Sequence, residues 1–158
     1  MKIALLLTGK TTESYIKAGF LIFEKRIKHY LPFEIVIIPD IPTSKKQNPV
    51  LVKEKEADIQ LKYLNENDLL VLLDEKGREF RSVEFATFIQ KQMNSSVKNL
   101  IFLVGGPYGF SERIYNRANA KISLSKMTFS HQIIRLLFME QLYRAFSIIR
   151  NEPYHHEG

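Results

Sequence analysis

Apolar and polar positions are grouped in blocks along the chain, and the spacing of the apolar residues changes from block to block. Some blocks are short, nearly continuous runs of Leu, Ile, Val and Phe, which are typical of buried strands; they cover residues 2–8, 33–38, 69–73, 100–104 and 122–124. The longer blocks between and after them are predicted to be helices; they cover residues 12–30, 49 to about 65, 82–94, 111–119 and 130–150. This alternation predicts an α/β fold, a mostly parallel sheet flanked by helices.

Three of the predicted strands end in residues that suit a ligand site. These ends are Leu73-Asp74, Gly105-Gly106 and Leu124-Ser125. In open parallel sheets, ligands bind beyond the carboxyl ends of the strands. If these three strands are neighbours, their loops converge on one crevice.

The second of these ends continues into the glycine-rich segment VGGPYGF, residues 104–110. The segment matches neither the dinucleotide fingerprint GxGxxG nor the phosphate-binding P-loop, and Pro107 has no N–H to offer a phosphate. Two interpretations are open. The glycines serve a strand-to-helix turn that needs positive φ, or they let the backbone approach a ligand closely.

The third end continues into LSKMTF, residues 124–129, just before the most hydrophobic predicted helix. A plain connector would be rich in Gly, Pro or Asn, whereas this one carries Leu124, Met127 and Phe129. Apolar side chains with main-chain polar groups between them suit a flat purine ring. The alternative is a loop that plugs the core, with Met127 and Phe129 simply buried.

Length and composition narrow the class of protein. The 158 residues suit a single domain, residues 1–158. The absence of cysteine excludes disulfides and thiolate metal sites, and no metalloprotease motif occurs, so we expect no metal. No segment approaches the roughly 20 apolar residues of a membrane span, and the run from Ile3 to Leu7 is too short for a signal peptide. We therefore expect a cytoplasmic protein without a membrane partner.

Charge points to a polyanionic partner. Lys and Arg number 23 against 17 Asp and Glu, a formal net charge of +6. Nucleic acid is the commonest partner of such a basic chain. A solvated surface with a cationic bias is the alternative, since net charge also serves solubility.

The last predicted helix is apolar around most of its circumference, so it must be buried on more than one side. In so small a domain the sheet can cover only one side, and a symmetric dimer would cover the other. The tail that follows contains Tyr154, His155 and His156. These residues could stack on a base or exchange protons at neutral pH, or the tail could be a frayed terminus.

Five segments together resemble the RlmH family, SPOUT-superfamily methyltransferases that modify N3 of a pseudouridine in 23S ribosomal RNA. They are LLD with Gly77, VGGPYG, LSKMTFSH, EQLYRAF and the terminal Tyr154-His155, and the resemblance covers the whole chain. It implies a SPOUT-type fold with a C-terminal trefoil knot, a homodimer, and S-adenosylmethionine (SAM) as cofactor. The implied cofactor-binding residues are Leu73, Gly105, Gly106, Gly109, Leu124, Ser125, Lys126, Met127, Thr128 and Phe129.

The resemblance also implies catalytic positions at Arg144, Tyr154 and His155. His155 is our candidate to assist loss of the N3 proton. Tyr154 could pack on or hydrogen-bond to the base, and Arg144 could hold a phosphate or polarise a uracil carbonyl. Implied partners are a second copy of the chain and 23S rRNA within the ribosome, and we expect no DNA. Two other functions stay open: a non-catalytic RNA- or ribosome-binding module, and a small-molecule enzyme that binds another nucleotide.

Overall fold

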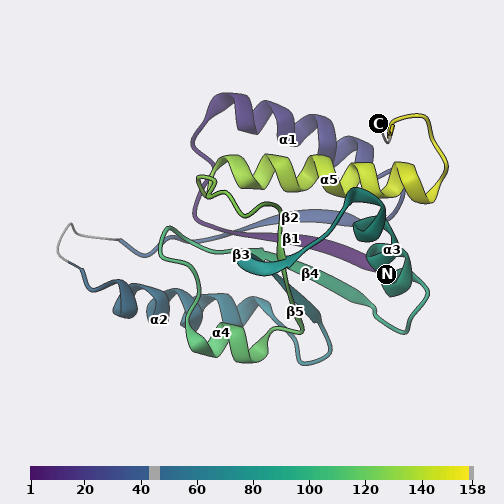
Figure 1. Ribbon diagram of the computed structural model, residues 1–158. Coiled ribbons are helices and arrows are strands. Elements are labelled where there is room, and N and C mark those ends of the chain that lie inside the picture. The colour runs from purple at the N-terminus through teal and green to yellow at the C-terminus, as the bar shows by residue number, and fades with distance from the viewer. Residues whose placement is uncertain (43–46, 157–158) are drawn as a thin grey trace.

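Five parallel strands form one sheet in the order β2-β1-β4-β3-β5 (Figure 1). The computed structural model describes residues 1–42 and 47–156. The strands are β1 (Lys2–Thr8), β2 (Phe33–Ile38), β3 (Leu69–Glu79), β4 (Asn99–Val104) and β5 (Ala120–Ser123). The helices are α1 (Ser14–Ile27), α2 (Pro49–Gln60), α3 (Ser82–Met93), α4 (Glu112–Arg117) and α5 (Ile133–Ile149), with a short 3₁₀ turn at Leu61–Tyr63.

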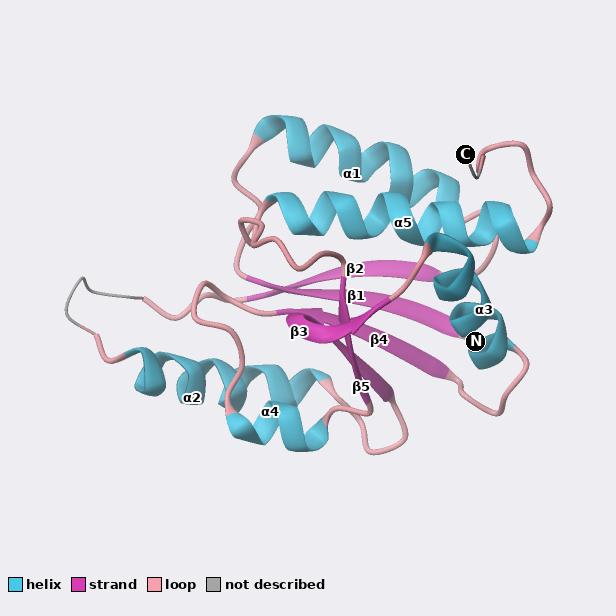
Figure 2. Ribbon diagram, viewed as in Figure 1, coloured by secondary structure: helices cyan, strands magenta, loops and turns pink. Residues whose placement is uncertain are grey.

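Helices cover both faces of the sheet, with α1, α3 and α5 on one face and α2 and α4 on the other (Figure 2). Because successive side chains of a strand point to opposite faces, each strand feeds two cores. Ile3 and Leu5 of β1 pack beneath α1 and α5, whereas Ala4 and Leu6 pack against the layer of α2 and α4. Burial on both faces is the reason the strands are continuously apolar.

The predicted α/β architecture is confirmed, and every strand is parallel to its neighbours. The predicted helices begin or end a few residues away from the observed ones, where polar residues blur the periodic signal. Within the described part of the chain, no helix combines the length and apolar character that crossing a bilayer requires.

Strand β3 runs six residues beyond its predicted end at Leu73 and meets β5 twice. Ile122 of β5 pairs with Leu73 and, after a register shift, also with Arg78. Since a strand residue has two edges, the two segments of β3 flank β5. Gly77 lies in the bend between them, where a Cβ atom would sit 2.6 Å from the backbone nitrogen of Ile122. A strand held this closely between two segments of β3 is compatible with a threaded chain. The trefoil knot itself stays a prediction.

Candidate functional site

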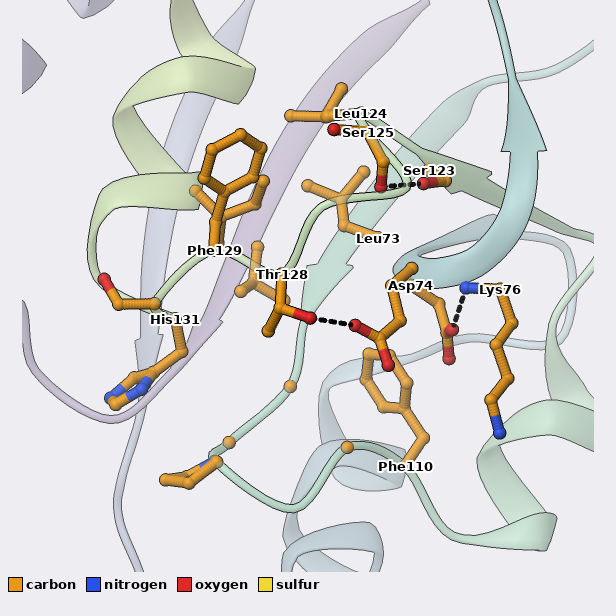
Figure 3. A pocket seen from close by; sticks show the side chains of 18 of the residues that line it. Leu73, Asp74, Lys76, Phe110, Ser123, Leu124, Ser125, Thr128, Phe129 and His131 are labelled. Carbon is orange, nitrogen blue, oxygen red and sulfur yellow. Dashed lines mark hydrogen bonds between the residues drawn. The ribbon is translucent and has the colours of Figure 1, made fainter.

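A cavity of about 470 Å³ opens at the carboxyl ends of β4 and β5 and at the bend in β3 that follows Leu73. Its walls come from residues 73–76, 104–110, 122–125 and 127–131, together with Tyr115 and Ile134. The three strands are neighbours in the sheet, as the convergence of their loops requires. In Figure 3 Leu124 and Ser125 lie at one end of the cavity, Phe110 at the other, and Phe129 and His131 along one side.

The glycine loop forms one wall with very little side-chain volume. Gly109 adopts a φ of +80°, which L side chains rarely take. At Gly105, a Cβ atom would come within 3.0 Å of the ring of Phe110. The loop is therefore a tight turn, as the first interpretation expected, and it also leaves backbone exposed to the cavity; close approach of a ligand to this backbone stays a prediction.

The segment 124–129 is folded by its own short side chains. The hydroxyl of Ser123 donates to the carbonyl of Ser125 at 2.7 Å, and the hydroxyl of Ser125 accepts from the N–H of Met127 at 3.0 Å. The Thr128 hydroxyl then donates to Oε2 of Glu75 at 3.0 Å, which connects this loop to the bend in β3 (Figure 3). The loop is thus held across the cavity from the glycine turn.

The side chains of this loop do not plug the core. Met127 is 75% exposed and Phe129 40% exposed, and both line the cavity. The core-plugging alternative is therefore wrong. Of the ten residues expected to bind the cofactor, nine line this cavity, whereas Lys126 is exposed and lies outside it.

Two acidic residues in the bend of β3, Asp74 and Glu75, line one side of the cavity. Oδ1 of Asp74 accepts from the N–H of Lys76 at 2.8 Å, and the Tyr115 hydroxyl donates to the other carboxylate oxygen. The pKa of Tyr115 is raised, chiefly by burial and next by this hydrogen bond to Asp74. The phenol therefore stays neutral at physiological pH and can donate a hydrogen bond. Together with Glu75, Asp74 favours a ligand with positive charge.

The three expected catalytic residues meet one another at the far end of α5. Arg144 contacts Nδ1 of His155 at 3.4 Å, and its guanidinium lies 4.7 Å from the centre of the Tyr154 ring. The residue that joins them is Glu140, which was not among the expected catalytic residues. Its Oε1 accepts from Nε and Nη2 of Arg144 at 3.1 and 2.6 Å, and from the Tyr154 hydroxyl at 3.0 Å. The i,i+4 spacing of Glu140 and Arg144 was the available signal.

This cluster does not reach the cavity of its own chain. Ile134, near the start of α5, lines the cavity, and Arg144 lies ten residues further along the same helix, which corresponds to about 15 Å at 1.5 Å per residue. The structure thus brings nine of the ten expected cofactor residues together, and separately the catalytic ones, about ten residues apart along one helix. Among the described residues, His, Asp and Glu side chains nowhere gather in threes to hold a metal ion.

Comparison with known proteins identifies the family. A family model described as "Predicted SPOUT methyltransferase" matches residues 1–155. The chain belongs to the RlmH family of SPOUT methyltransferases. A relative from Parabacteroides distasonis is 54% identical, and one from Cytophaga hutchinsonii 56% identical; each alignment covers 99% of this chain and 100% of the relative. Both relatives are named "Ribosomal RNA large subunit methyltransferase H".

Membership in this family makes the chain a methyltransferase and agrees with the geometry of the site. The matched region includes the glycine loop, the segment 124–129 and the tail as far as His155. A methyltransferase needs a methyl donor, and the cavity at the ends of β4 and β5 and the bend in β3 is where the ligand of a parallel α/β sheet is expected.

Proposed function

We propose that this protein methylates N3 of a pseudouridine in 23S ribosomal RNA, with SAM as methyl donor and the assembled ribosome as substrate. The observation that carries the proposal is the cavity between the glycine turn and the segment 124–129, in a chain of the RlmH family. A ribosomal substrate would also place the enzyme in the cytoplasm.

The residues that line the cavity fit the proposed cofactor. SAM joins a flat adenine to a cationic sulfonium and supplies an electrophilic methyl group. Leu73, Leu124 and Phe129 offer apolar contact for the adenine, and Asp74 with Glu75 favours the positive charge. SAM has no phosphate, which agrees with the lack of a phosphate-binding motif. Gly105, Gly106 and Gly109 allow close approach to the backbone on the opposite side.

The catalytic cluster suits the handling of an imide proton. Histidine is the commonest general base in enzymes, which suits His155 as the acceptor of the N3 proton, and Arg144 beside it can stabilise negative charge on a uracil carbonyl once that proton leaves. The pKa of Tyr154 is raised, chiefly by burial and next by the hydrogen bond to Glu140. Tyr154 therefore acts as a neutral donor or packing surface, and Glu140 holds both Arg144 and Tyr154 in place.

A second copy of the chain would bring this cluster to the cavity. The outer face of α1 exposes Leu21 and Ile22, which are 71% and 51% accessible, and α1 packs beside the half-exposed Leu136 and Tyr143 of α5. Apolar surface of this kind favours an isologous dimer. We propose that in the homodimer the tail of one chain completes the site of the other.

Positive charge would guide the RNA to this site. Four basic residues are candidates for phosphate contact: Arg78, Arg113, Arg117 and Lys121. Arg113 is already paired with Glu54 and Asp58, and Arg117 donates to the carbonyls of Asn65 and Asp68. Arg78 and Lys121 are therefore the better candidates, and ribosome binding should weaken steeply with salt.

Single-turnover methylation of ribosomes tests the proposal. We expect Arg144→Ala and His155→Ala to slow methyl transfer by about 10²-fold or more, the range of acid–base and electrostatic contributions, with SAM affinity unchanged in calorimetry. Full rates in both variants would remove the catalytic roles. A wild-type protein that binds ATP or NAD but not SAM would instead favour another nucleotide-dependent enzyme.

A further inference from the structure

A second cavity, of about 510 Å³, adjoins the first. Pro107, Tyr108 and His131 line both cavities. The second cavity extends from these shared residues to the ends of β1 and β2 and to one side of α2, where its lining includes Lys10, Asp40 and Glu56. A ligand in the first cavity could therefore continue into the second past the glycine loop.

Glu56 is an unusual residue for this position. Its side chain is only 5% exposed, on a helix that otherwise carries its charges at the surface, and its carboxylate lies directly behind the glycine loop. A Cβ atom on Gly106 would come within 2.6 Å of Oε1 of Glu56. Oε2 is buried and has no hydrogen-bond partner among the described residues. A buried carboxylate without donors is destabilising unless a ligand supplies them.

Within the part of the chain that the structure describes, the charged residues around Glu56 do not supply a hydrogen-bond donor to its carboxylate. Burial, and secondarily the charge of Asp40, raises the pKa of Glu56 to about 7. The nearby cation Arg135 is fully buried but directs its N–H groups to the carbonyls of Thr8, Gly9 and His131 and to the Thr11 hydroxyl. Two carboxylates, Glu56 and Asp40, thus face the same cavity, with Lys10 exposed at its rim.

We propose that the second cavity binds the amino-acid end of the methyl donor, whose ammonium group donates hydrogen bonds to Glu56. The proposal rests on SAM as the cofactor of the first cavity. An ammonium has three donors and a full positive charge, which two adjacent carboxylates attract more strongly than a neutral base. Lys10 at the rim is suited to the α-carboxylate of the same group. The adenosine end stays in the first cavity, and the shared residues Pro107 and Tyr108 lie between the two ends.

Two ligands with an uncharged sulfur distinguish binding of the amino-acid end of the methyl donor from binding of its adenosine end. S-adenosylhomocysteine carries the amino-acid end, whereas methylthioadenosine lacks it, so the ratio of their Kd values measures the second cavity alone. In calorimetry at pH 8 we expect Glu56→Gln to weaken S-adenosylhomocysteine about 10- to 100-fold, the ratio that a hydrogen bond to a charged group confers. Methylthioadenosine should change by less than about twofold, since it makes no such bond.

Control variants keep the result interpretable. Glu66→Gln removes the same charge from an exposed turn and should leave both affinities unchanged. Lys10→Ala alters an exposed side chain and should weaken S-adenosylhomocysteine about two- to fivefold, as exposed ion pairs do. An unchanged ratio of Kd values in Glu56→Gln, including equal weakening of both ligands, would overturn the inference while leaving SAM as cofactor. If neither ligand bound the wild-type protein, the proposed function would fail with it.

Discussion

Two buried charges near the site illustrate how single residues shape it. Arg135, with no exposed surface, donates to three carbonyls and a hydroxyl, so the turn after β1 is tied to the start of α5. A guanidinium stays charged even when burial lowers its pKa, and here its donors are satisfied. Glu56 has no such partners within residues 1–42 and 47–156. Residues of the first kind hold a site together, whereas an unsatisfied one marks a place for a ligand.

The unsatisfied carboxyl of Glu56 should weaken the unliganded protein as pH rises. Folding raises its pKa from 4.5 to about 7, so between these values the folded state binds more protons than the unfolded state, and stability falls as pH increases through this window. The loss reaches up to about 3 kcal/mol by pH 8. Urea denaturation at pH 5 and pH 8 measures it.

Glu56→Gln should remove this part of the pH dependence, whereas Glu66→Gln should keep the wild-type profile. Burial also lowers the pKa of His131, which makes stability rise with pH. This effect is the same in the wild type and in both variants. The same pH profile in wild type and Glu56→Gln would mean that Glu56 is not charged and desolvated in the native state.

At the scale of elements, the loop 124–129 is positioned by the overrun of β3. Because β3 continues past Leu73, Glu75 lies where Thr128 can donate to it. The loop otherwise depends on the local contacts of Ser125, and its apolar residues Met127 and Phe129 remain exposed. A segment with so few buried contacts is easily displaced, so the bond between Thr128 and Glu75 should matter for the shape of the cavity.

Thr128→Val, which replaces the hydroxyl by a methyl group of similar size, should loosen this loop. We expect a two- to fivefold loss of SAM affinity, the share of about 0.5–1 kcal/mol that a partly exposed hydrogen bond contributes. Hydrogen exchange should accelerate in residues 124–130. Thr87→Val removes a comparable hydroxyl, bonded to the carbonyl of Val83 on α3, and serves as the control. Unchanged exchange and affinity in Thr128→Val would count against a role for this bond.

At the scale of the whole molecule, the cavity and the catalytic cluster lie about ten residues apart along α5. A helix is rigid, so no rearrangement within one chain brings Arg144 to a cavity about 15 Å away. An isologous dimer whose two-fold axis passes across α5 would remove the difficulty, because the two copies of α5 would then lie antiparallel, with the end of one near the start of the other. The exposed apolar side chains of α1 provide surface for such an interface.

Mixing two inactive variants tests whether the site is shared between chains. Arg144→Ala lacks the cluster, and Gly105→Leu should displace the ring of Phe110 and so deform the cavity wall, so each homodimer should be inactive. Random mixing at equal amounts makes half of the dimers mixed, and each mixed dimer has one intact site out of two. We therefore expect about a quarter of wild-type activity. Light scattering checks the dimer, and circular dichroism checks the fold. No recovery in a mixture that does form mixed dimers would place cluster and cavity in the same chain.

The sequence by itself determined the layers of the fold and the location of the site. Continuous apolar runs predicted strands buried on both faces, and the loops after Leu73, Val104 and Leu124 were expected to converge because parallel strands end at one edge. The resemblance of short segments added the cofactor residues, nine of which share one cavity. These properties are local or periodic, so they can be read along the chain.

Tertiary structure alone decided what depends on distant neighbours. It buried Glu56 behind Gly106, 50 residues away, although Glu56 belongs to a charged stretch that reads as a surface helix. It continued β3 past Leu73, because β5 offers a second edge to Arg78. No spacing in the sequence encodes these outcomes, because each depends on which segments the fold packs together.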